Sequence, residues 1–89
     1  MKEIKEFSDL VFKPHMLEIN SKQAKMFFEN GYGVSVLQGK MFYSNGIDTY
    51  EVAVLKEGRL CYDTPITDNV IGYVDKDRVS EIMKQIQEL

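Results

Sequence analysis

The chain has 89 residues, of which 44% are hydrophobic and 28% charged, and its formal net charge is −3. This length allows one domain, and the balance of apolar and charged residues excludes a disordered chain. Lys and Arg are spread along the sequence, which disfavours the concentrated basic face that nucleic-acid binding requires. No stretch approaches the ~18 apolar residues of a membrane span, so we expect no membrane contact. A mildly acidic surface instead fits a protein partner, for instance a basic one.

Cys61 is the only cysteine. Neither an internal disulfide nor a zinc site built from several thiolates is therefore expected. A small secreted domain usually carries several disulfides, so this cysteine content favours a reducing compartment. We also expect no signal peptide, because no long apolar run follows the charged residues 1–6.

The first predicted element is an edge strand at residues 10–13. Pro14 follows it, holds its predecessor in extended backbone, and is tolerated in a sheet mainly at an edge. Residues 20–23, with the sequence Asn-Ser-Lys-Gln, are predicted to form a loop or turn.

The strongest local signal is a hairpin around Asn30-Gly31. This dipeptide separates alternating runs at 24–29 and 32–37, and it is typical of a type I′ turn, in which both central residues need φ > 0. Gly33 inside the returning strand indicates a bulge or a close approach of two backbones. The alternation assigns five side chains to the core: Met26, Phe28, Tyr32, Val34 and Val36.

A second hairpin is predicted after a loop at residues 38–46. The first strand of this hairpin, 49–55, is predicted to point Tyr50, Val52 and Val54 toward the core. Glu57-Gly58 then turns the chain into a strand at 59–63. A turn-rich connection at 64–69 leads to a short apolar segment, 70–74, that can add a further strand.

The last predicted element is a helix at residues 76–88. Asp75 is a suitable N-cap, and Asp77 places negative charge in the first turn. Four apolar residues recur at helical spacing and should face the sheet: Val79, Ile82, Met83 and Ile86. The predicted fold is therefore α+β, with an antiparallel sheet of four to five strands, built from two consecutive hairpins, packed on one C-terminal helix.

The sequence offers no recognisable catalytic pair. His15 is the only histidine, which we interpret as a surface or edge residue, and Cys61 is interpreted as a buried structural thiol. The Gly31-x-Gly33 pattern lacks the third glycine and the following helix of a dinucleotide site. We therefore expect neither enzymatic activity nor a cofactor.

Four aspartates lie within residues 63–77, at positions 63, 68, 75 and 77. Clustered carboxylates can bind a divalent cation, but this spacing matches no EF-hand loop, and no metal is expected. Asp75 is explained as the helix cap and Asp63 as a turn opener. The turn still supplies four candidate residues for ligand or partner contact: Tyr62, Asp63, Thr67 and Asp68.

One helix covers only one face of a sheet of four or five strands. We therefore expect Phe27, Leu37 and Leu55, together with Phe42 and Tyr43, to lie on the other face or in loops. An uncovered apolar patch of this kind marks a protein partner or a homodimer contact. Phe42 and Tyr43 are the candidate contact residues in that region.

Three stretches resemble a group of short proteins encoded by bacteriophages and prophages: residues 28–36 (FENGYGVSV), residues 60–68 (LCYDTPITD) together with 70–73 (VIGY), and residues 81–86 (EIMKQI). The resemblance implies expression in the cytoplasm of an infected or lysogenic bacterium, and it implies no activity, cofactor or site residue. The first functional hypothesis is a non-enzymatic binding protein that acts on a host or anti-phage defence factor. The alternative is a small-molecule-binding protein or minimal enzyme, with a dimer-interface pocket formed by residues 62, 63, 67 and 68.

Overall fold

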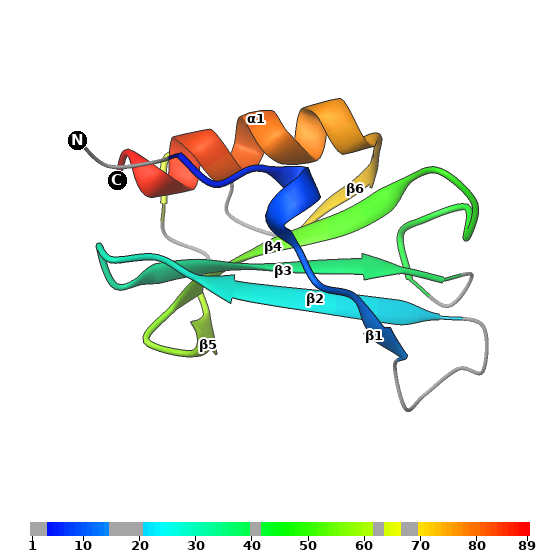
Figure 1. Cartoon of the computed structure of the whole chain (residues 1–89), viewed down its shortest axis with the longest axis horizontal. Coiled ribbons are helices and arrows are strands. Elements are labelled where there is room, and N and C mark those ends of the chain that lie inside the picture. Colours follow the sequence, from blue (N-terminus) through cyan, green and yellow to red (C-terminus); the bar gives the residue numbers. More distant parts are fainter. Residues whose placement is uncertain (1–3, 15–20, 40–41, 62–63, 67–69) are drawn as a thin grey trace.

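The computed structural model describes residues 4–14, 21–39, 42–61, 64–66 and 70–89. Within them the chain forms a six-stranded antiparallel sheet and one α-helix, α1 (Lys76–Gln87). The helix lies across one face of the sheet (Figure 1). The predicted α+β fold, with two hairpins and a single C-terminal helix, is confirmed.

The sheet has a simple up-and-down order, because successive strands lie beside one another. Its order is β1 (Lys13–Pro14), β2 (Lys22–Phe27), β3 (Tyr32–Gln38), β4 (Tyr50–Lys56) and β5 (Arg59–Leu60). A sixth strand, β6 (Ile71–Val74), also pairs with β4. Since β3 occupies one edge of β4, β5 and β6 share the other edge.

The N-terminal segment differs from the prediction. Residues 10–13 do not form a strand: a 3-10 helix, η1 (Phe7–Asp9), comes first, and only Lys13 of the predicted residues joins the sheet. The backbone N–H of Glu6 donates to the Asp9 carboxylate over 2.9 Å, which closes this short helical turn. The prediction of an edge position is confirmed, because β1 is the first strand of the sheet.

The prediction of a loop at residues 20–23 is wrong for the last two of these residues. Lys22 and Gln23 belong to β2, where they pair with β1 on one side and β3 on the other. These two polar residues adopt strand conformation because the neighbouring strands satisfy their backbone groups on both sides. The local sequence does not reveal these neighbours.

The first hairpin is present, but its turn is not type I′. Gly31 has φ of 87°, whereas Asn30 is not in the positive-φ region. The backbone N–H of Gly31 donates to Phe28 O, and that of Phe28 donates to Tyr32 O, which defines a three-residue loop ending in a left-handed glycine. The Asn30 amide instead donates to the Ile86 carbonyl over 2.9 Å, so it ties the hairpin to the end of α1.

The second hairpin has the type I′ conformation that was predicted for the first. Glu57 and Gly58 have φ of 53° and 82°, and they connect the paired residues Lys56 and Arg59 directly. The N–H of Glu57 also donates to the Gly31 carbonyl over 3.0 Å, so the two turns lie against each other.

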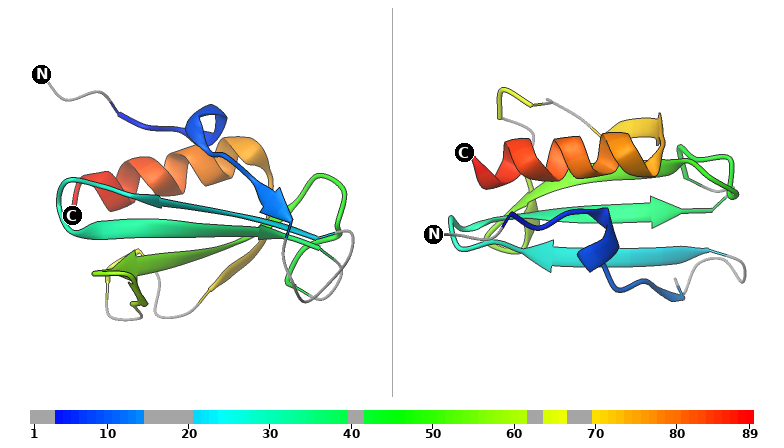
Figure 2. Two further views of the ribbon diagram at one scale, coloured as in Figure 1. Left: turned by 60° about the horizontal axis from the view of Figure 1, so that its bottom comes forward. Right: turned by 45° about the horizontal axis from the view of Figure 1, so that its top comes forward.

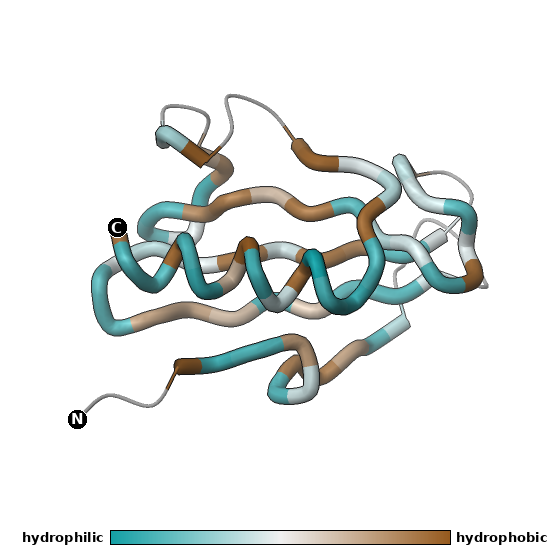
Figure 3. Tube along the Cα trace, turned by 90° about the horizontal axis from the view of Figure 1, so that it is seen from above, coloured by the Kyte–Doolittle hydropathy of each residue, from teal (hydrophilic) through white to brown (hydrophobic). Residues whose placement is uncertain are grey.

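The core lies between α1 and the sheet. Asp75 caps the helix as predicted, because its carboxylate accepts a 2.8 Å hydrogen bond from the Arg78 N–H. Hydrophobic and hydrophilic residues alternate along the helix (Figure 3). Eight side chains at the helix–sheet contact are almost fully buried: Val34, Val36, Val52, Val54, Val79, Ile82, Met83 and Ile86. The predicted inward faces of both hairpins and of the helix are thus confirmed.

Candidate functional site

We call the sheet face turned away from α1 the open face. In the described part of the chain, η1 and α1 both lie on the opposite side of the sheet (Figure 2). The strand register assigns eleven residues to the open face: Lys13, Gln23, Lys25, Phe27, Gly33, Ser35, Leu37, Glu51, Ala53, Leu55 and Leu60.

The centre of the open face is made of small or buried residues. Ser35, Ala53 and Leu55 are all buried, although none of them belongs to the core cluster beneath α1. The Gln23 amide donates to the Ser35 hydroxyl over 3.1 Å, which satisfies that hydroxyl. Leu55 lies on the open face, as expected, between Gly33 and Leu60 in the strand register. The expectation that it is uncovered is wrong, because only 4% of its surface is exposed.

One cross-strand row of the open face carries exposed apolar groups at both ends. The row runs from Phe27 through Gly33 and Leu55 to Leu60. Phe27 is 60% exposed and Leu60 is 54% exposed. A Cβ atom on Gly33 would lie 2.7 Å from the Met26 carbonyl oxygen and 2.9 Å from Phe27 Cδ1, so glycine lets the Phe27 ring lie flat on the strand. The predicted close approach at Gly33 is confirmed, with no bulge in its register.

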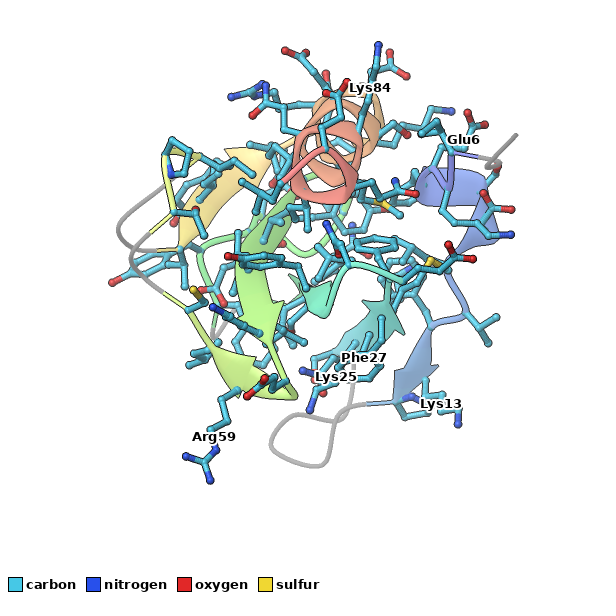
Figure 4. All side chains as sticks on the ribbon, turned by 90° about the vertical axis from the view of Figure 1, so that its left-hand side faces the viewer. Glu6, Lys13, Lys25, Phe27, Arg59 and Lys84 are labelled. Carbon is cyan, nitrogen blue, oxygen red and sulfur yellow. The ribbon has the colours of Figure 1, made fainter. Side chains whose placement is uncertain are left out.

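The open face is more basic than the chain as a whole. Lys13 and Lys25 belong to it, and Glu51 is its one acidic residue among those assigned above. The Glu51 carboxylate accepts a hydrogen bond from the Tyr43 N–H over 3.2 Å. Lys25 and Phe27 lie next to each other on the side away from α1 (Figure 4). The assigned residues of this face therefore carry a small excess of positive charge, although the net charge of the chain is −3.

The strand β2 has a backbone edge that β1 covers only in part. β1 pairs with Lys22 and Gln23 alone. Because Phe28 hydrogen-bonds Tyr32 across the hairpin, the alternate residues Met26 and Ala24 turn their backbone groups toward β3. Lys25 and Phe27 consequently turn their N–H and C=O groups outward, where no strand of the described chain pairs with them. We call residues 24–27 on this side the free edge.

A pocket of about 330 Å³ adjoins the end of the free edge. It lies between residues 4–5, the hairpin residues 27–30 and Gln87 of α1. The Gln87 side chain holds residues 4–5, which form the N-terminal wall of the pocket, in place. It accepts a hydrogen bond from the Lys5 N–H and donates one to the Lys5 carbonyl, both over 2.8 Å. Apolar walls come from Ile4, Phe27 and Phe28.

A second exposed cluster contains Tyr43 and Tyr73, which are 58% and 63% exposed. Their ring centroids are 6.4 Å apart, and the Tyr73 N–H donates to the Tyr43 carbonyl over 2.9 Å. Tyr73 has φ of 54°, a left-handed conformation that is uncommon for an aromatic residue. A Cβ atom on Gly72 would lie 2.6 Å from Tyr43 Cβ, so this glycine permits the contact. Phe42, the other candidate of this loop, is half-buried.

The predicted acidic-turn site lies outside the described residues, as does His15. This applies to Tyr62, Asp63, Thr67 and Asp68. The described residues 64–66 of that turn lie at the opposite end of the sheet from the loop that holds Tyr43 (Figures 1 and 2). Cys61 is buried, as predicted for a structural thiol.

The fold and its surfaces define a small α+β domain with one helix-covered face and one open face. Comparison of the chain with family models, with curated proteins and with solved structures gave no match. Among the described residues, no group of three His, Cys, Asp or Glu side chains is arranged to hold a metal ion. The described helices include none that is long and apolar enough to cross a membrane.

Proposed function

We propose that this protein is a non-enzymatic binding protein whose open face docks on a partner protein. The observation that carries the proposal is the row with exposed Phe27 and Leu60 at its two ends, beside Lys25. Large exposed apolar groups on a face that neither described helix covers are typical of interaction surfaces.

The same residues suggest the chemistry of the partner. Phe27 and Leu60 require apolar groups opposite them, whereas Lys13 and Lys25 favour carboxylates. We therefore propose a partner surface with an apolar centre and acidic rim. A second copy of this chain fits less well, because two copies of the open face would bring their lysines together.

The resemblance to bacteriophage and prophage proteins supports a target inside the infected bacterium, namely a host or anti-phage defence factor. A stoichiometric rather than catalytic role is supported by the sequence, whose single histidine and single cysteine form no recognisable catalytic motif. The small-molecule alternative depends on residues 62, 63, 67 and 68, and no observation on the described residues favours it.

Site-specific photo-crosslinking in bacterial lysate tests this proposal. A photoreactive phenylalanine replaces Leu60 on the open face, and a matched control replaces Lys84 on the exposed side of α1. We expect one adduct of defined mass from position 60 and none from position 84. Phe27→Glu should abolish the adduct, and added salt should weaken it.

Two outcomes contradict the proposal. Equal adducts from positions 60 and 84, unaffected by Phe27→Glu, would show that the open face has no special role. A dimer of the chain itself, detected by light scattering and disrupted by Phe27→Glu, would show that a second copy covers the face.

A further inference from the structure

We infer that the free edge of β2 receives an extended acidic segment of the partner as an added strand, and that one apolar side chain of this segment enters the adjoining pocket. This inference rests on the proposed binding function and specifies how the partner is held. Strand addition draws its affinity from backbone hydrogen bonds and its specificity from pockets for alternate side chains.

β1 is much shorter than β2. Its two residues pair with Lys22 and Gln23, and because the strands are antiparallel, the residues that would continue the pairing are those before Lys13. Residues 10–12 are not part of a strand, so β1 covers only the first part of β2. Beyond it, Lys25 and Phe27 together offer two N–H donors and two C=O acceptors along the free edge. An incoming strand can pair with all four groups without disturbing the β2–β3 ladder.

The opposite side of the sheet is protected against such pairing. β5 has only two residues, Arg59 and Leu60. β6 has an irregular register between its paired residues, and Tyr73 within it adopts positive φ. Short and irregular edge strands are devices that prevent strand addition. In the described chain, the free edge of β2 is therefore the more accessible one.

A lysine on an edge strand is also an ordinary protection against aggregation, and Lys25 by itself fits that role. Two further observations distinguish this edge from a merely protected one. Phe27 follows with 60% of its surface exposed, although an edge built for protection avoids a large exposed aromatic group. The pocket then opens directly at Phe27.

The pocket is large enough to take an apolar side chain of the segment. Its volume of about 330 Å³ is at the lower end of the range for small-molecule sites. A strand advances about 3.3 Å per residue, so a segment of roughly four to six residues spans the free edge and reaches the pocket. Ile4 and Phe28 favour an apolar side chain there.

Charge selects the remaining positions of the segment. Side chains of an added strand that project on the open face lie beside Lys25 and Phe27. An acidic residue beside Lys25 and an apolar one beside Phe27 complement this edge. The inferred ligand is therefore an extended peptide in which an acidic residue and an apolar residue lie two positions apart, so that both project on the open face, with a large apolar residue at the pocket end.

The test uses a capped synthetic peptide of about eight residues, in which Glu and Val lie two positions apart so that both project on the open face, and which ends in Leu. Its control has the same side chains but carries N-methyl groups on the amides of one edge, which prevents strand pairing. Binding to the full chain is followed by NMR titration. We expect the amide signals of Lys25 and Phe27 to shift, and the methylated peptide to bind at least about tenfold more weakly.

Two protein variants separate the backbone from the charge. Lys25→Pro removes an outward N–H while leaving the bonds to β3 intact, and Lys25→Ala removes the same charge but keeps that N–H. We expect Lys25→Pro to weaken binding about tenfold more than Lys25→Ala. An unchanged NMR dispersion and thermal midpoint establish that both variants are folded.

Equal binding of both peptides, or equal binding by both variants, overturns the inference. A chain dimer that Lys25→Pro dissociates also overturns it, because the edge then pairs with a second copy. The crosslink from position 60 keeps the two proposals distinguishable. If position 60 still crosslinks a partner in the otherwise unchanged chain while the peptide fails to bind that chain, docking on the open face stands and strand addition is rejected.

Discussion

Replacement of Phe27 by alanine should weaken partner binding far more than it weakens the fold. Phe27 is 60% exposed. A phenylalanine buries roughly 200 Å² when fully covered, so a partner can remove about 120 Å² of this side chain from water. At ~25 cal/mol per Å² this area contributes about 3 kcal/mol, or a loss of about 100-fold in affinity.

The cost to folding should be smaller. The remaining two-fifths of the side chain is covered within the chain, chiefly by the Gly33 strand. That area corresponds to about 2 kcal/mol as an upper bound, because denatured chains already bury part of it. We expect Phe27→Ala to lower the free energy of unfolding by about 1 kcal/mol and the thermal midpoint by roughly 4–8 °C.

Ile47→Ala is the matched control, because Ile47 is 79% exposed but lies in the loop between β3 and β4. It should change both affinity and unfolding free energy by less than about 0.5 kcal/mol. Affinity is measured by calorimetry on the partner captured through position 60. The reasoning is refuted if Phe27→Ala binds like the wild type, or if Ile47→Ala loses as much affinity.

Substitutions at three further positions test the account of the fold. Asn30→Ala should lower the free energy of unfolding by about 1–2 kcal/mol, because the Ile86 carbonyl loses its donor. Asn30→Gly should cost a similar amount in the same denaturant titration, whereas tolerance of glycine would indicate a type I′ turn. Glu57→Asn should raise the thermal midpoint, with a gain of about 0.5–1 kcal/mol, because asparagine adopts positive φ more readily; a lower midpoint would contradict the turn assignment. Burial is the main cause that raises the pKa of Tyr50 above its ordinary value of 10.0, although a hydrogen bond with Gln38 opposes it. The folded state therefore resists deprotonation of the Tyr50 phenol. The stability that the protonated phenol contributes is complete below pH 10 and is lost as the pH rises through the pKa of Tyr50 in the folded state. Thermal midpoints measured from pH 9 upward should accordingly fall less steeply in Tyr50→Phe than in the wild type, and parallel curves would exclude this coupling.

Local sequence signals predicted much of the fold. Alternation in the two hairpins and the apolar stripe of the helix follow from the periods of strands and helices. The turn types were not predicted correctly from the local sequence. Asn30 was assigned to a turn by its preference for positive φ, but its amide bonds the distant Ile86 carbonyl. Glu57 adopts positive φ although glutamate has no such preference, because the two turns and the β4–β5 pairing fix its backbone.

The N-terminal segment shows the other limit of local reasoning. Phe7 and Phe12 gave residues 7–13 the apolar density of a strand, yet both side chains pack around Tyr50 in the core. The backbone between them leaves the sheet to reach that position. No pattern in residues 7–13 indicates that Tyr50, which lies far along the chain, is their neighbour.

The candidate site was foreseen only in part. The exposed Phe27 follows from its position out of phase with the core residues of its strand. The free edge and the pocket do not, because they depend on where β1 ends and on the bonds between Gln87 and Lys5. Contacts that join residues at opposite ends of the chain leave no periodic trace in the sequence.

Amide hydrogen exchange of the full chain, alone and bound to its captured partner, tests most directly whether the β2 edge holds that partner. The account predicts marked slowing at Lys25 and Phe27 on binding, with little change along the exposed side of α1. Slowing confined to α1, with Lys25 and Phe27 exchanging as in the unbound chain, would contradict it.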